Sequence, residues 1–194
     1  MKANTTNTTN TTPQEWLRSA GAQGDVIDGL ARFGDWATLY RECPRGDWLL
    51  AIAERLGVDH VALVRAAIAC ARIADGDEEA TAVLDAAARW TEDRGAASEV
   101  AEATRALEAA ASRAVDPASE AAGRAALAVG LGIDDRGVLP SAPAAAAESV
   151  MVASIDCGLE LAMRWAHDKC ASAVRSAVPW STFDACIARI GSQS

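Results

Sequence analysis

The chain has 194 residues, of which 51% are hydrophobic but only 5% aromatic, and its net charge at pH 7 is −9. This length suits one domain or at most two small ones, and the hydrophobic fraction is large enough to form a core without disulfides or a metal. The acidic balance argues against nucleic acid or an anionic membrane as partner, because both need a basic face. It is compatible with a basic protein partner.

The cysteines and the termini indicate the compartment. Five cysteines occur at wide spacing and without a Cys-x-x-Cys pair, at Cys43, Cys70, Cys157, Cys170 and Cys186. This pattern predicts reduced, mostly buried thiols. No run approaches the roughly 18 apolar residues of a membrane span, and the first residues lack the apolar stretch of a signal peptide. We therefore expect a cytoplasmic protein.

The first twelve residues, MKANTTNTTNTT, form a three-residue repeat of low complexity. Such a polar repeat predicts a disordered tail, with a docking peptide as the alternative. The folded part is then expected over residues 13–191. Thr12, Pro13 and Glu15 form a helix start, because the threonine can cap the helix and the glutamate can close a capping box. Two further short helical segments are expected over 25–33 and 35–43.

The most apolar continuous run covers residues 44–72 and predicts two helices joined by a glycine turn. Asp47 and Asp59 are the expected N-caps of these helices. Gly57 suits the left-handed position after the first helix. Apolar residues recur three to four positions apart in both segments, so this helical hairpin is expected to belong to the core.

The rest of the chain also shows helical periodicity and no competing strand pattern. Further helices are expected at 78–93, 98–115, 116–129, as one long helix at 144–177, and after Ser181. Residues 130–143 contain three glycines and two prolines, so they predict the longest loop and a possible sub-domain boundary. The sequence thus predicts a single all-α domain, a bundle of about eight helices stacked as antiparallel hairpins.

Candidate metal and catalytic residues are few. His167 and Cys170 lie three residues apart on one helix, within reach of one ion, but a surface histidine and a small buried thiol are the simpler interpretation. Glu99 and Glu102 resemble half of the Glu-x-x-Glu arrangement of all-α Mg²⁺-dependent nucleotide hydrolases, without a second pair. Nucleophile and phosphate-loop motifs are absent from the sequence. We therefore assign no catalytic, cofactor-binding or metal residue, and the hydrolase remains an alternative.

The six tryptophans are candidates for core or interface anchors. Trp48 and Trp90 lie on strongly amphipathic segments and are expected in the core. Trp36 and Trp180 lie near helix starts beside loops, where partial exposure is more common. Trp36 and Trp180 are therefore the candidate interface residues.

Three segments resemble a family of alanine-rich helical bacterial proteins that includes immunity proteins of polymorphic-toxin systems. They are CPRGDWLL at 43–50, LVRAAIACAR at 63–72 and AAARW at 86–90. The likeness covers about residues 35–130. The chain departs from the family pattern at Ile68, where a cysteine is common, and in the IADGDEE segment that follows Arg72. The resemblance implies an all-α, non-catalytic protein that binds another protein, such as a toxin, and it carries over no functional residue.

These observations lead to one function and two alternatives. The function is a non-catalytic cytoplasmic protein-binding module, in its specific form an immunity-like inhibitor that sequesters a basic toxin or effector. The first alternative is a self-assembling structural or scaffold protein, because alanine-rich helices can pack closely into a homo-oligomer. The second is the Mg²⁺-dependent hydrolase that would use Glu99 and Glu102. No cofactor is expected.

Overall fold

Helices account for all the regular secondary structure that the computed structural model describes, which covers residues 12–21, 24–111 and 116–191. The α-helices are α1 (Pro13–Ser19), α2 (Gly24–Leu30), α3 (Trp36–Glu42), α4 (Gly46–Arg55), α5 (His60–Ala71), α6 (Glu78–Glu92), α7 (Ala97–Ala110), α8 (Pro117–Leu131), α9 (Ser141–Ala153), α10 (Leu159–Ala177) and α11 (Trp180–Gly191). The expected all-α class is confirmed. These eleven helices within the described ranges exceed the eight or so that we expected. Apart from Thr12, the expected disordered tail lies outside the described residues.

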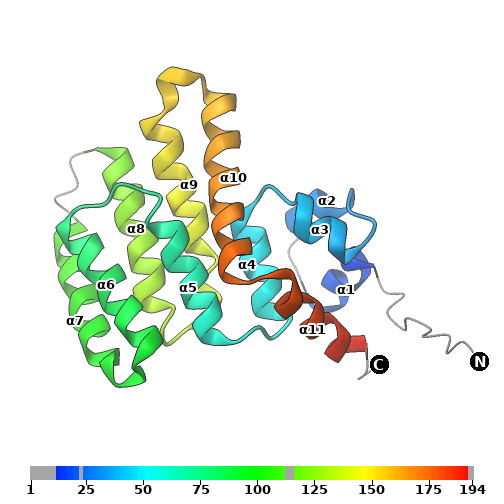
Figure 1. Ribbon diagram of the computed structural model, residues 1–194. Coiled ribbons are helices and arrows are strands. Elements are labelled where there is room, and N and C mark those ends of the chain that lie inside the picture. The colour runs from blue at the N-terminus through cyan, green and yellow to red at the C-terminus, as the bar shows by residue number, and fades with distance from the viewer. Residues whose placement is uncertain (1–11, 22–23, 112–115, 192–194) are drawn as a thin grey trace, which may run out of the picture.

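The N-terminal helices α1, α2 and α3 gather on one side of the molecule, next to α11 (Figure 1). The capping box at the start of α1 is formed, because the Glu15 amide donates to the Thr12 hydroxyl and the Thr12 amide donates to the Glu15 carboxylate. Gly29, in the middle of α2, lies directly against the ring of Trp48. A side chain at residue 29 would collide with that ring, which explains a glycine inside a helix.

The helical hairpin expected at 44–72 is formed by α4 and α5. Asp59 caps α5 by accepting hydrogen bonds from the backbone N–H groups of the first turn, and Gly57 adopts a φ of +75° in the turn. The expected cap at Asp47 is wrong. Arg45 occupies the N-cap position and helix α4 begins at Gly46, two residues earlier than a cap at Asp47 implies. Asp47 therefore lies in the first turn and forms an ion pair with Arg45 instead.

Helix α5 occupies the middle of the molecule and contacts α4, α6, α8, α9 and α10 (Figure 1). Small side chains allow these helices to approach closely. At the start of α4, the Gly46 backbone lies so near α10 that a Cβ there would be 2.7 Å from the carbonyl carbon of Cys170. The core is therefore built from close helix contacts as much as from large side chains.

The segment expected to be a long loop at 130–143 is shorter than predicted. Helix α8 continues to Leu131, α9 begins at Ser141, and a 3₁₀ turn at Arg136–Val138 lies between them. Leu139 is fully buried. The carbonyl of Gly132 lies 2.8 Å from Nε2 of the buried His60. Helices α8 and α9 pack side by side across this connection.

The single long helix expected at 144–177 is wrong. Helix α9 ends at Ala153, and the chain reverses through a 3₁₀ turn at Ile155–Cys157 and through Gly158, whose φ is +97°. The physical reason for the break is this glycine, which adopts a backbone conformation that other residues avoid. The two helices that result form a hairpin, and its turn projects beyond the other helices (Figure 1).

None of the helices in the described ranges combines the length and the apolar character required to cross a membrane.

Candidate protein-binding surface

The projecting turn of the α9–α10 hairpin, residues 154–165, is called the hairpin end below. The inner part of α10 is held by α4 and α5 as well as by α9. Figure 1 shows that the hairpin end rises past these supporting helices, so that its two helix ends have only each other as neighbours. This part of the chain therefore has two sides open to solvent.

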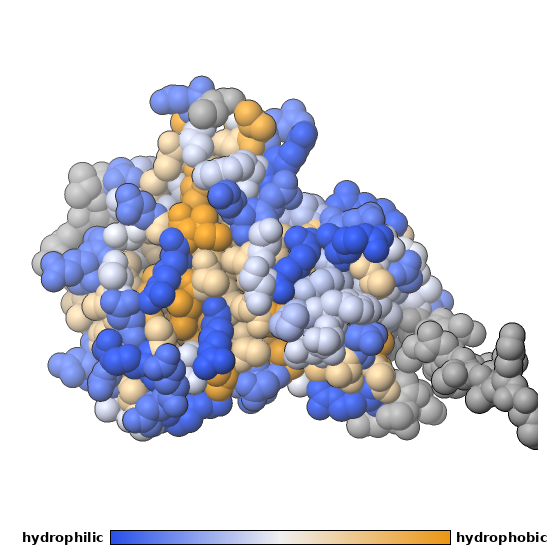
Figure 2. Space-filling view, viewed as in Figure 1, coloured by the Kyte–Doolittle hydropathy of each residue, from blue (hydrophilic) through white to orange (hydrophobic). Residues whose placement is uncertain are grey.

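Large hydrophobic side chains are concentrated at the hairpin end. In the described part of the chain, six large hydrophobic side chains are exposed, and five of them lie within the hairpin end: Ile155, Leu159, Leu161, Met163 and Trp165. Leu161 is the most exposed of them, at 60%, and the sixth is Leu131 of α8, at 47%. Hydrophobic side chains are visible near the turn in Figure 2. Isolated exposed hydrophobics are normal, whereas a cluster of this kind is typical of an interaction surface and makes the hairpin end the candidate.

The exposed residues of α10 form two pairs on nearly opposite sides of the helix. Residues four positions apart share a face, so Leu159 lies above Met163 and Leu161 lies above Trp165. The two pairs are offset by two positions, which corresponds to about 200° around the helix. Both flanks of the hairpin end are consequently apolar.

The Leu159–Met163 pair continues the buried stripe of α10 outward. Met163 follows Leu159 by four positions, and Ala166 follows Met163 by three. This helical repeat places all three residues on one face. Ala166 is completely buried. The outer two residues are exposed because the supporting helices end before reaching them. Leu159 and Met163 therefore resemble core residues over which no neighbouring helix packs.

The Leu161–Trp165 pair borders a hollow of about 270 Å³. Its other lining residues are Ser154 and Ala162. The ammonium group of Lys169 lies 5.1 Å from the centre of a Trp165 ring. The surface therefore combines projecting apolar side chains, an apolar depression and a charged rim, a composition that is typical of protein contacts.

Charges at the hairpin end are few and balanced. Residues 154–169 carry three acidic and two basic side chains, against nine net negative charges for the whole chain. The Arg164 guanidinium forms an ion pair of 3.0 Å with Glu160 one turn away. This region is thus nearly neutral in an otherwise acidic protein.

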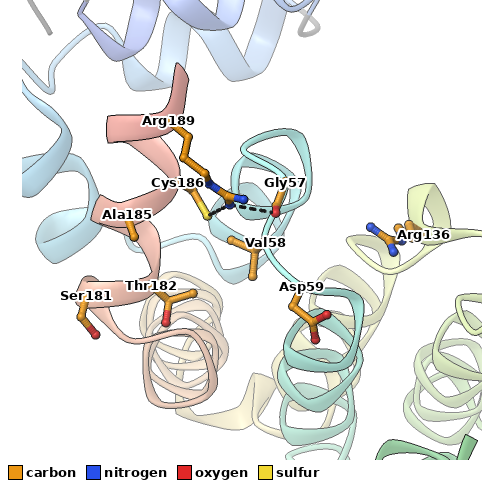
Figure 3. Close-up of a pocket in the computed structure, with 9 residues that line it drawn as sticks. All are labelled: Gly57, Val58, Asp59, Arg136, Ser181, Thr182, Ala185, Cys186 and Arg189. Carbon is orange, nitrogen blue, oxygen red and sulfur yellow. Dashed lines mark hydrogen bonds between the residues drawn. The ribbon is translucent and has the colours of Figure 1, made fainter. Parts of the chain in front are cut away.

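A second concavity, of about 620 Å³, lies between α11 and the turn that joins α4 to α5 (Figure 3). The Arg189 side chain, at its edge, donates to the carbonyl of Gly57 and lies 2.8 Å from Sγ of Cys186. Asp59 faces the same hollow but already caps α5. Arg189 thus links α11 to the turn, and Asp59 is committed to capping α5, so we interpret this concavity as a structural junction.

The structure places both candidate interface residues, Trp36 and Trp180, in one aromatic cluster. Each lies close to Phe183, with ring centres 6.3 Å and 6.1 Å apart respectively. Both are partly buried. The cluster also contains Trp16 and Tyr40 and joins α1 and α3 to α11. Their placement gives both tryptophans an internal packing role, and an additional interface role remains a prediction.

Tyr40 also stabilises the packing of α3 against the end of α10 through polar contacts. Its hydroxyl lies within hydrogen-bond distance of the carbonyls of Arg175 and Val178, at 3.1 Å and 3.0 Å. Partial burial raises the pKa of Tyr40. The Arg175 side chain in turn donates to the carbonyls of Tyr40 and Cys43. The end of α10 is therefore tied to α3 and to the loop that follows it.

The residues considered for metal binding lie apart from any cluster. Glu99 and Glu102 are exposed on α7, and Glu99 forms a 3.0 Å ion pair with Arg89. Cys170 is fully buried, whereas His167 is half-buried, and this burial lowers the pKa of His167. Across residues 12–21, 24–111 and 116–191, the structure contains no group of three or more His, Cys, Asp or Glu side chains arranged to hold a metal ion.

The buried thiols have the properties of core residues. The hydrogen bond to Cys170, together with burial, raises the pKa of Cys70 well above its usual value. Burial likewise raises the pKa of Cys43. Because the thiolate is the nucleophilic form, these raised pKa values leave the thiols protonated and unreactive at neutral pH.

Sequence reasoning missed the hairpin end because it treated 144–177 as one helix. Two signals were present: a glycine at position 158, inside the expected helix, and two large apolar residues, Leu161 and Trp165, away from the stripe of Ala162, Ala166 and Cys170. The first marks a turn and the second an exposed apolar flank.

Comparisons of the chain with protein-family models, with curated proteins and with solved structures gave no match.

Proposed function

We propose that this protein is a non-catalytic protein-binding module and that its binding surface is the hairpin end. The proposal is carried by one observation: five of the six large hydrophobic side chains exposed in the described residues lie within one projecting turn. Contact with a partner would remove these side chains from water without rearrangement of the core.

The available energy suits a protein contact. Complete burial of a large aliphatic side chain contributes roughly 1.5–3 kcal/mol. The aliphatic side chains of the hairpin end are about half exposed, so each retains on the order of 1 kcal/mol to gain on contact. Trp165 adds the amphipathic ring that most often dominates binding interfaces.

The specific form of the function that we propose is an immunity-like inhibitor that acts in the cytoplasm by sequestering a toxin or effector. It draws support from the sequence resemblance over residues 35–130 and from the charge of −9, which favours encounter with a basic partner. Arg65 and Arg72, within the resembling segments, are exposed, whereas the apolar residues of these segments are mostly buried. We therefore assign the segments to the core and the contact to the hairpin end.

Site-specific photo-crosslinking in the native host tests this proposal. A photoreactive amino acid is placed at position 161 and, in a matched control, at position 131, which is also an exposed leucine on a helix. We expect one discrete crosslinked protein from position 161 and none from position 131. Equal products from both positions would contradict the proposal. The same probe is also placed at positions 36 and 180, and a product from either of these positions alone would move the interface to the aromatic cluster.

A further inference from the structure

We infer that, in the absence of another partner, the Leu161–Trp165 flank of the hairpin end is covered by a second copy of this chain, packed antiparallel across a two-fold axis between these two residues. The inference rests on the proposed function in that it uses the same surface. It goes further by naming the occupant and the geometry: two hairpins that form a four-helix arrangement.

The surface is complementary to itself in shape. A two-fold contact requires one patch to supply both the projecting and the receiving parts. Leu161 and Trp165 project from the helix, and they also border the hollow of about 270 Å³. This hollow leaves room for a side chain of the second copy.

The surface is also complementary to itself in charge. When the two-fold axis passes at the height of residue 163, the antiparallel helices bring position 169 of one copy opposite position 157 of the other. Lys169 of one copy is then next to the turn that carries Asp156 of the other. Residues 154–169 differ by only one charge from neutrality, so two copies can meet there with little net repulsion.

The expected dimer is weak. Stable interfaces bury about 1,200–2,000 Å² in total, and a contact confined to a few turns of two helices lies below this range. We expect a dissociation constant of roughly 10–100 µM. A partner with a larger contact area would displace the second copy, so the dimer and the proposed function share one surface without conflict.

Sedimentation and light scattering of the full chain across this concentration range test the inference. We expect the mass to rise from one chain toward two as the concentration increases. The double substitution Leu161→Ala with Trp165→Ala should raise the dissociation constant at least about tenfold. Leu131→Ala, the matched control, should change it by less than about twofold. A mass of one chain up to roughly 1 mM, or equal effects of the two sets of substitutions, would overturn the inference.

A charge exchange tests the antiparallel geometry. Lys169→Glu should weaken the dimer, and adding Asp156→Lys should restore it to within about threefold, because the pair is reversed rather than lost. The control adds Asp184→Lys to Lys169→Glu instead. This change restores the net charge at an exposed position of α11 and should not rescue the dimer. The proposed axis would be overturned if Asp156→Lys and Asp184→Lys both restored the dimer, or if neither of them did.

These outcomes separate the inference from the proposed function. A chain that stays monomeric yet crosslinks a foreign protein from position 161 would overturn the dimer and leave the binding module supported. A dimer with the expected response to substitution, but without a foreign crosslink, would support the inference and count against the inhibitor.

Discussion

The two halves of α10 differ in an unexpected direction. The inner half buries small side chains, among them Ala166, Cys170 and Ala171, against α4, α5 and α9. The outer half exposes large ones, including Leu161 and Trp165. In most helices of globular proteins the large apolar residues lie inside. Burial in this helix is decided by whether a neighbouring helix is present, and residue type alone does not predict it.

The comparison also separates two roles of apolar residues. In the inner half, small side chains let helices approach closely, which stabilises the fold. In the outer half, large side chains remain available to a partner. Substitutions in the inner half should therefore change stability, and substitutions in the outer half should change binding.

A matched pair of leucine substitutions gives the largest expected contrast. Leu63→Ala, in α5, removes a side chain that is completely buried and should lower the free energy of unfolding by about 2–5 kcal/mol. Leu161→Ala should change it by less than about 0.5 kcal/mol. Urea denaturation of both variants measures the difference. A similar loss in both would mean that the hairpin end is already part of the core.

Gly46→Ala should break the close contact of the inner half. Its Cβ would lie 2.7 Å from the backbone carbonyl carbon of Cys170, an atom that cannot move aside without shifting α10. We expect a loss of about 1–3 kcal/mol in the free energy of unfolding. The control is Gly123→Ala, because a Cβ at residue 123 would have its nearest neighbour at 3.9 Å. This substitution should stabilise the protein by about 0.4–1 kcal/mol. A neutral Gly46→Ala would show that the helices are not closely packed there.

Gly158→Ala should strain the turn without creating a clash. The φ of this residue is +97°, and a Cβ would meet nothing within 4 Å. We expect a loss of about 1–2 kcal/mol, confined to the hairpin end. Hydrogen exchange should therefore quicken in the outer turns of α9 and α10 while the protection of α5 stays unchanged. Faster exchange throughout the molecule would show that the hairpin end is not an independent unit.

His167 should give the smallest effect, visible as a pH dependence. Burial is the largest cause that lowers the pKa of His167 in the folded state, and the nearby Arg45 lowers this pKa further. Asp47 and Asp168 act in the opposite direction. The unfolded chain therefore binds the proton first, and stability should fall as the pH drops below about 6.5. His167→Gln should flatten this slope between about pH 7.5 and 5.5. An unchanged slope would assign the pH dependence to other groups.

The fold class could be predicted because helical periodicity and caps are local. The caps at Thr12 and Asp59 are confirmed, since each side chain accepts at least one hydrogen bond from a backbone N–H group of the next turn. The start of α4 was misplaced by two residues, because both Gly46 and Asp47 are compatible with the first turn. Local signals therefore give the helices but only approximate ends.

The candidate surface was not predictable in the same way. Apolar periodicity continues from α9 into α10, so it hid the turn that Gly158 allows. The exposure of Leu159 and Met163 depends on where α4 and α5 end, which is a property of the packed molecule. Trp36 and Trp180 were selected for their positions near loops, yet both pack against Phe183 from separate segments.

Oxidative footprinting of the full chain inside the native host cell tests most directly whether the hairpin end is a covered binding surface. Trp165 and Met163 are 46% and 43% exposed, and Leu131, at 47%, serves as the internal reference. We expect the oxidation of Trp165 and Met163, relative to Leu131, to be several-fold lower in cells than in dilute purified protein. The same ratio in both conditions would mean that no partner covers the hairpin end, and would contradict the proposed function.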